Sequence, residues 1–227
     1  MSLSLPAEIV RARRNTVGDA LRRSARRHRS RAALTYGDRS WSFDELNNAA
    51  DRVALYYAQL GLKAGDRVLC YGKNSDAYLI AFLGCTRFGA IHVPINYALT
   101  GDELVYLVKQ SGAALVLGDP DLVPNLAVLG ADQPTTRLLK GEPGNDLLSA
   151  ALSGALPDAD FEVDDTSVAQ FLYTSGTTAA PKGAMLAHGG ILAEYQTCIQ
   201  DLELRDSDRA LAALPLYHTA QDRKSVV

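Results

Sequence analysis

The sequence predicts a layered α/β/α fold whose sheets are mostly parallel. From residue 32 onward, apolar stretches with helical spacing alternate with short extended stretches, which is typical of α/β domains with a parallel sheet. Glycines follow the expected helices, and turn sequences such as Gly65-Asp66 precede the expected strands. The 227 residues are 47% hydrophobic and 22% charged, a composition that suits one large or two small globular domains.

The α/β part of the chain is expected to begin with a hairpin and a long helix. Two extended stretches, 32–36 and 40–43, flank a Gly-Asp turn. Ser42 and Glu45 then have the spacing of a capping box. Apolar residues follow at helical spacing until Gly61, which should end the helix.

The remaining elements are expected from the same two periodicities. Further strands should cover residues 67–71, 90–93, 114–117, 136–139, 168–173 and 209–214. Further helices should cover residues 76–88 and 190–204, with another starting at the capping pair Thr100 and Glu103. The segment 119–165 should hold one or two short helices, and the strand at 136–139 should lie at a sheet edge.

The N-terminal segment is rich in arginine. Its first 39 residues contain ten arginines and three acidic residues. Apolar residues lie among them at helical spacing, namely Val17, Ala20, Leu21 and Ala25. This pattern predicts an amphipathic surface helix whose arginines face solvent, with a mitochondrial transit peptide as the main alternative. The net charge of -3 gives no reason to expect nucleic acid as a partner.

Membrane, disulfide and metal functions are not indicated. Since no run of 18 or more apolar residues occurs, we expect a soluble, cytoplasmic protein without a transmembrane segment. The cysteines are odd in number and form no Cys-x-x-Cys pair, so we expect three buried free thiols: Cys70, Cys85 and Cys198. The four histidines are too dispersed for metal-ligand spacing, and no metal site is predicted: His28, His92, His188 and His218.

The chemistry-bearing residues are concentrated in one loop, directly after the expected strand at 168–173. Its sequence is Thr174-Ser175-Gly176-Thr177-Thr178-Ala179-Ala180-Pro181-Lys182-Gly183. Glycines let backbone N–H groups face a phosphate, hydroxyls donate to its oxygens, and Lys182 adds a positive charge. A phosphate-rich ligand is therefore predicted, although an exposed Ser/Thr/Gly loop needs no ligand. Neither the P-loop pattern nor Gly-x-Gly-x-x-Gly is present.

The loop and the expected strand before it resemble a known signature. Tyr-Thr-Ser-Gly-Thr-Thr-x-x-Pro-Lys-Gly, beginning at Tyr173, is similar to the signature of the adenylate-forming superfamily, which includes acyl-CoA synthetases, peptide-synthetase adenylation domains and luciferases. Ala179 stands where that family usually has glycine. Other landmarks of the family follow in the same order and spacing, at 41–46, 61–68, 89–96 and 214–221. The last of these resembles the versions found in fatty acyl-CoA ligases.

The resemblance implies the N-terminal subdomain of the adenylate-forming fold. It also implies an enzyme that joins a carboxylic acid, here a fatty acid, to ATP and transfers the acyl group to coenzyme A, with Mg²⁺ on the phosphate oxygens. The residues expected to hold the β- and γ-phosphates are Thr174, Ser175, Gly176, Thr177, Thr178, Lys182 and Gly183. Tyr217 and His218 would border the acid, although by itself His218 could be a strand-end histidine without a ligand.

Two further expectations concern the extent and class of the chain. Residues 1–221 should form a partial N-terminal AMP-binding domain, and 222–227 do not resemble its continuation and should be an atypical tail. The chain is therefore expected to be a truncated, inactive piece of an acyl-CoA ligase. The alternatives are a peptide-synthetase adenylation domain, an aromatic-acid CoA ligase, or a nucleotide-binding protein without catalysis.

Overall fold

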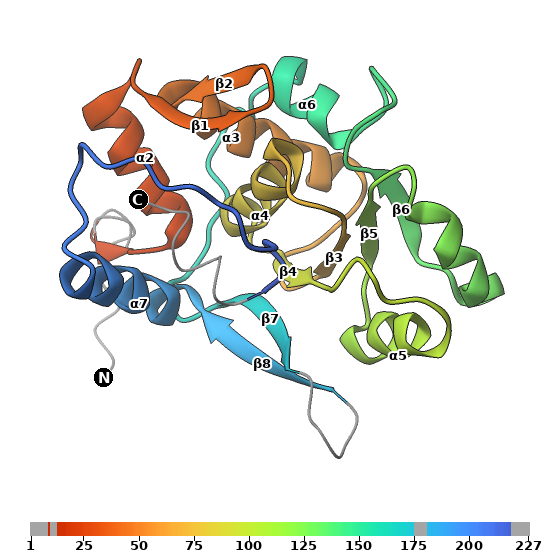
Figure 1. Ribbon diagram of the computed structural model, residues 1–227. Helices are drawn as coiled ribbons and strands as arrows, with labels where there is room; N and C mark the ends of the chain where they lie inside the picture. The colour runs from red at the N-terminus through yellow and green to blue at the C-terminus, as the bar shows by residue number, and fades with distance from the viewer. Residues whose placement is uncertain (1–8, 10–12, 175–180, 219–227) are drawn as a thin grey trace, which may run out of the picture.

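The protein is built around one six-stranded sheet with helices on both faces (Figure 1). The computed structural model describes residues 9, 13–174 and 181–218. A separate antiparallel hairpin, β1 (Ala32–Tyr36) and β2 (Arg39–Ser42), packs against α3 (Phe43–Gln59) and α4 (Asp76–Phe88). The predicted α/β/α architecture is confirmed. Within the described ranges, no helix is long and apolar enough to cross a membrane.

The sheet is parallel except at one edge. Its strands are β3 (Arg67–Tyr71), β4 (Ile91–Pro94), β5 (Leu115–Gly118), β6 (Thr135–Leu138), β7 (Val168–Thr174) and β8 (Lys182–Ala187). They lie in the order β6-β5-β3-β4-β7-β8, and only the β7–β8 pair is antiparallel. The edge position of β6 matches the prediction. Strand β8 is not among the predicted elements, because Lys182 and Gly183 were assigned to the phosphate loop and residues 184–187 to no element.

Both faces of the central strand β3 are buried, each in a different apolar core. Because side chains alternate along a strand, Val68 and Cys70 pack into one core, whereas Leu69 and Tyr71 pack into the other. The first core is covered by α2 (Val17–His28), α3 (Phe43–Gln59), α4 (Asp76–Phe88), α6 (Leu147–Ser153) and α7 (His188–Asp201). The second is covered by α5 (Gly101–Ser111) and the 3-10 helix η1 (Val123–Asp132).

Two of the predicted helix ends are confirmed and one capping contact is not. At the start of α3, Ser42 Oγ accepts from the Glu45 N–H at 3.2 Å, and Glu45 Oε2 accepts from the Ser42 N–H at 2.8 Å. Gly89 ends α4 in the left-handed conformation, with φ of 89°. Thr100 lies at the N-cap of α5 but its side chain makes no capping hydrogen bond. That helix is instead held by its buried apolar face.

The C-terminal part of the described chain differs from the prediction. Helix α7 begins at His188 and ends at Asp201, whereas residues 190–204 were expected. The strand expected at 209–214 does not form, and Leu211 is 86% exposed. The physical reason is that a strand needs a neighbour for its backbone N–H and C=O groups. No strand of the described chain lies beside this segment.

A buried arginine joins three helices of the first core. Arg87 of α4 donates to Asp51 Oδ1 at 2.8 Å and to Asn47 Oδ1 at 2.9 Å, both on α3. Its second terminal nitrogen, Nη2, also lies 3.3 Å from the Gly18 carbonyl oxygen of α2. Burial lowers the pKa of Arg87 to about 10. The amphipathic helix predicted for the N-terminal segment is thus attached to the core through a charged contact as well as apolar ones.

The expectation about the cysteines is confirmed in part. Cys70 and Cys85 are buried free thiols, and burial raises the pKa of Cys85 to about 12. Cys198 on α7 is also free, but it is only half-buried, so one of the three expected burials is wrong. Its side chain belongs to neither of the two apolar cores.

Helices α3 and α4 approach each other closely at Gly84, where a Cβ atom would overlap the side chain of Val53. We expect Gly84→Ala to lower the free energy of unfolding by about 1–3 kcal/mol, because the core has no room for another carbon. Gly190→Ala is the matched control, since nothing lies within 4 Å of a Cβ there and alanine favours the helix. Urea denaturation monitored by circular dichroism measures both. Equal stability of the two variants would contradict the close contact.

His188 should make the protein less stable in acid. The ring is buried and its Nδ1 accepts from the Val17 N–H at 3.3 Å; burial lowers its pKa from 6.5 to about 4. The unfolded chain therefore binds a proton first, and stability should fall by up to about 3 kcal/mol as the pH drops from 6.5 to 4. His188→Asn keeps an acceptor without titrating. Melting temperatures across this pH range should decrease less for the variant; parallel curves would refute the prediction.

Candidate phosphate site on the β7–β8 hairpin

The hairpin of β7 and β8 carries both ends of the predicted phosphate loop. Thr174 is the last residue of β7 and pairs with Lys182, the first residue of β8. Gly183 pairs with Tyr173. The structure therefore brings three of the predicted residues together, Thr174, Lys182 and Gly183, as parts of strands. The other predicted residues, Ser175, Gly176, Thr177 and Thr178, lie outside the described residues, as does Ala179.

An aromatic ring lies close to the glycine at the base of the hairpin. A Cβ atom at position 183 would lie 3.3 to 3.5 Å from the ring and hydroxyl of Tyr173. The shortest of these distances is slightly tighter than ordinary van der Waals contact. Gly183 thus allows the backbone of β8 to approach a half-buried tyrosine on the paired strand.

Helix α5 holds both sides of the hairpin. The Tyr106 hydroxyl donates to the carbonyl oxygen of Pro181 at 3.1 Å, and the Tyr173 hydroxyl donates to Gln110 Oε1. Tyr106 and Gln110 are four residues apart, so they lie on one face of the helix. Figure 1 shows α5 beside the hairpin, on the side of the sheet opposite to α3 and α4. The two ends of the loop are therefore anchored to the same rigid element.

The charge of Lys182 is not neutralised by the described parts of the protein. Its side chain is exposed on β8, the edge strand of the sheet. None of the ion pairs formed among the described residues includes it. A lysine ammonium in this position can interact with an anionic ligand that lies between the two strands' ends.

The hairpin is joined by other polar groups at the same edge of the sheet. Strands β3, β4 and β7 are parallel, so their carboxyl ends share one edge. Asn74 follows β3, Tyr97 follows β4, and Thr174 ends β7. In open α/β sheets, ligands bind outside the carboxyl ends of the strands. The fold itself therefore marks this edge as the candidate ligand site.

The predicted acid-binding residues approach this edge from the C-terminal segment. The rings of Tyr217 and Tyr97 meet edge to face, with centroids 5.5 Å apart and planes at 82°. Partial burial and the nearby Tyr97 raise the pKa of Tyr217. His218 is exposed, and its N–H donates to the Pro215 carbonyl at 3.0 Å to close a turn. Tyr217 thus contacts Tyr97, in the segment that follows β4.

Sequence reasoning missed four residues at this edge. Tyr97, Asn74, Tyr106 and Gln110 were not singled out, although each contacts a segment that carries predicted site residues. The spacing of Tyr106 and Gln110 on one helix face could have been noticed. Their partners, however, lie more than 60 positions away in the sequence. Only the folded arrangement identifies them.

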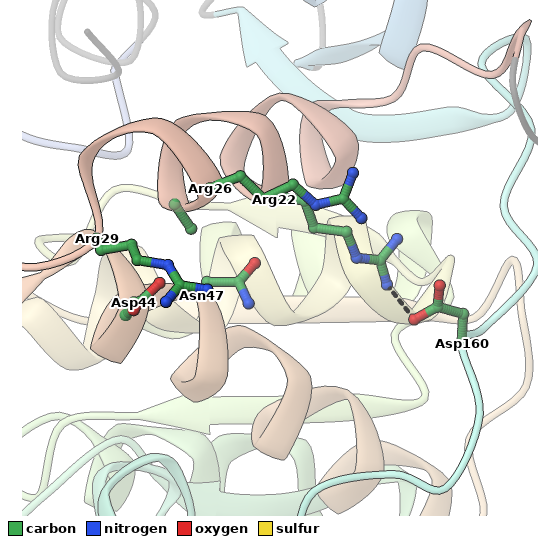
Figure 2. A pocket seen from close by; sticks show the side chains of 7 residues that line it. Arg22, Arg26, Arg29, Asp44, Asn47 and Asp160 are labelled. Atoms are coloured by element: carbon green, nitrogen blue, oxygen red, sulfur yellow. Dashed lines mark hydrogen bonds and ion pairs between the residues drawn. The ribbon is translucent and has the colours of Figure 1, made fainter.

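The depression lined by arginines lies elsewhere and is polar (Figure 2). It has a volume of about 240 Å³, between α2, the start of α3 and the segment around residue 160. Its lining is Arg22, Ala25, Arg26, Arg29, Asp44, Asn47 and Asp160. Arg22 donates to Asp160 Oδ1 at 2.7 Å, and Asp44 adds a second negative charge. The acidic residues offset most of the positive charge, so this depression does not compete with the sheet edge as an anion site.

Comparison with known proteins decides the family. Residues 21–222 match the AMP-binding enzyme family, which is most of the chain. The chain belongs to this family. The sequence is 35% identical over 198 residues to a feruloyl-CoA synthase of an Amycolatopsis species, and 32% identical over 188 residues to the fatty acid–[acyl-carrier-protein] ligase ScoC of Streptomyces coeruleorubidus. These alignments cover 87% and 79% of the chain.

The fold of this AMP-binding chain is also that of the family. The crystal structure of ATP-bound MatB from Rhodopseudomonas palustris superimposes with a TM-score of 0.73 at 32% identity, over 81% of this chain and 37% of that one. The chain spans 38% of the feruloyl-CoA synthase and 35% of ScoC. The described residues thus form the N-terminal part of the adenylate-forming fold, as the resemblance implied.

Removing the anchor between α5 and the hairpin should weaken ATP binding. Tyr106→Phe deletes the hydroxyl that donates to Pro181 and leaves the ring in place. A lost hydrogen bond of about 1 kcal/mol corresponds to a roughly fivefold higher KM for ATP in the full-length gene product, with kcat little changed. Tyr36→Phe, on the β1–β2 hairpin, is the control. If both variants have the same KM for ATP, the anchor does not position the loop.

Proposed function

We propose that this chain provides the ATP phosphate site of an acid–thiol ligase. The proposal is supported by membership of the AMP-binding family together with the hairpin that places Thr174 opposite Lys182. The residues proposed to hold the β- and γ-phosphates are Thr174, Ser175, Gly176, Thr177, Thr178, Lys182 and Gly183. The reaction joins a carboxylate to the α-phosphate of ATP, forms acyl-AMP and releases pyrophosphate.

The chemistry requires charge neutralisation, because a carboxylate must approach a polyanion. A fixed lysine and backbone N–H groups can stabilise the charge that develops on the departing pyrophosphate. Lys182 suits this role because its ammonium group has no ion-pair partner among the described residues and because β8 is tied to β7. Holding both reactants in line contributes a further large part of the rate enhancement.

Magnesium would lower the charge of the triphosphate when it is bound with ATP. Across the described ranges, no group of three or more His, Cys, Asp or Glu side chains is suited to a metal ion. We therefore assign no magnesium ligand to the described residues. The phosphate oxygens themselves suit the ion, which prefers oxygen ligands and retains water.

The acid is proposed to lie against Tyr217 and His218, where Tyr217 packs on Tyr97. We propose a fatty acid as substrate and coenzyme A as the thiol acceptor, because Pro215 to Gln221 resemble the fatty acyl-CoA ligases. A cytoplasmic location belongs to the same proposal. An aromatic acid is the second candidate, favoured by the 35% identity to a feruloyl-CoA synthase.

Acid-dependent ATP–pyrophosphate exchange by the full-length gene product tests the proposal. Lys182→Ala should lower the exchange rate by about 100-fold, as is typical when one donor to a developing anion is removed. Lys63→Ala is the matched control, because Lys63 is also exposed but precedes β3, at the opposite edge of the sheet. Its exchange rate should stay near that of the unaltered protein.

The choice of acid separates the two substrate candidates. A panel of fatty and aromatic acids, compared by kcat/KM, identifies the class that supports exchange.

An unchanged rate of ATP–pyrophosphate exchange in the Lys182→Ala variant would contradict the proposed role of Lys182 in phosphate binding. ATP binding without exchange for any acid in the panel would instead favour a nucleotide-binding protein without catalysis.

A further inference from the structure

The segment that carries Tyr217 is held by one asparagine side chain instead of a neighbouring strand. Asn74 Nδ2 donates to the Leu214 carbonyl oxygen at 2.8 Å, and Asn74 Oδ1 accepts from the Leu216 N–H at 2.8 Å. The same nitrogen lies 3.5 Å from the Ala212 carbonyl. These contacts join positions 138 to 142 residues apart in the sequence. Within the described chain, no strand pairs with this segment.

An asparagine is suited to this task because its carboxamide offers a donor and an acceptor side by side. The pair reproduces what the backbone of an adjacent strand offers, one N–H and one C=O. It satisfies two backbone groups, the C=O of Leu214 at the end of the strand expected at 209–214 and the N–H of Leu216 just beyond it. Two side chains of similar size cannot replace it: an ionised aspartate lacks the donor, and leucine lacks both donor and acceptor.

Asn74 itself is fixed to the rigid part of the fold. It follows β3, the central strand that is buried on both faces, and directly precedes Ser75, the N-cap of α4. The Ser75 side chain accepts from the Tyr78 N–H at 3.2 Å. Helix α4 is almost entirely buried. A side chain anchored in this way can impose a position on a segment that is otherwise exposed.

The position of Tyr217 follows from that of Leu216. Tyr217 is the next residue, and Leu216 is held both by Asn74 and by partial burial against the first core. The turn closed by the His218 N–H and the Pro215 carbonyl fixes the local backbone direction. The Tyr217 ring then reaches Tyr97, which follows β4. Asn74 therefore acts on the proposed acid site through the backbone, without touching the acid.

We propose that Asn74 is a positioning residue for recognition of the carboxylic acid. Its carboxamide fixes the backbone at Leu214 and Leu216, and this in turn places Tyr217 and His218. The inference rests on the proposed function, because only there do Tyr217 and His218 border the acid. It predicts a defect in the use of the acid and not in the use of ATP, whose proposed phosphate contacts lie on the β7–β8 hairpin.

Kinetics of the full-length gene product test this assignment. Asn74→Ala should raise the KM for the acid about tenfold, with the KM for ATP within about twofold of the unaltered value, because two hydrogen bonds are lost. Selectivity between fatty and aromatic acids should also decrease. Asn15→Ala, which removes an asparagine that accepts from Arg23 near α2, is the control and should change neither constant.

Hydrogen exchange provides a readout that does not depend on activity. The Leu216 amide should exchange about five- to tenfold faster in Asn74→Ala, because its acceptor is lost. In Asn74→Asp the acceptor remains, so the Leu216 amide should stay protected while the donor to Leu214 is lost. Mass spectrometry of peptides that span residues 212–218 measures this, and Pro215 contributes no amide.

The outcomes separate the two proposals. If the hydrogen-exchange rate of the Leu216 amide is unchanged in Asn74→Ala, the role of Asn74 is overturned, whatever the kinetic constants are. Faster hydrogen exchange at Leu216 can also occur with an unchanged KM for the acid, or with equal increases in the KM for the acid and for ATP. Either result overturns a specific role of Asn74 in acid recognition. If the unaltered protein shows no acid-dependent exchange of pyrophosphate, the proposed function fails, while hydrogen exchange still reports whether Asn74 holds the segment.

Discussion

The burial of the parallel sheet on both faces is the constraint on which the rest of the structure depends. Neighbouring parallel strands need crossover connections, and these place helices over both faces. In β3 the side chains therefore alternate between two apolar cores, Val68 and Cys70 on one face and Leu69 and Tyr71 on the other. Because β3, β4 and β7 are parallel, their carboxyl ends lie at one edge of the sheet. Polar groups at this edge can remain accessible to a ligand without exposing either apolar core.

The ends of the candidate phosphate loop are held in place at that edge of the sheet. A site for a polyanion needs its N–H groups and its lysine held in place. Helix α5 provides the support through Tyr106 and Gln110, one to each side of the hairpin. Since α5 packs in the second core, the apolar packing of the fold and the geometry of the ligand loop are connected through a few side-chain hydrogen bonds.

The segment proposed to border the acid is held in a different way. Residues 209–214 are apolar except for Arg209, as in a buried strand, but an apolar run states only that a segment can pair, not that a partner is present. In the described chain Asn74 supplies the missing donor and acceptor, and the edge-to-face contact of Tyr217 with Tyr97 completes the attachment. Helix α5 thus holds the hairpin of the proposed phosphate site, whereas Asn74, between β3 and α4, holds the segment proposed to border the acid.

Features that depend on local chemistry can be predicted from the amino-acid sequence. These are the α/β class, the capping box at Ser42 and Glu45, the left-handed Gly89 and the signature of the AMP-binding family, since each follows from residues close together in the chain. The tertiary structure decided what depends on distant partners. It placed Lys182 in a strand opposite Thr174, and it replaced the expected strand at 209–214 by contacts to Asn74. Backbone groups must find partners wherever the fold provides them, and no local pattern records where that is.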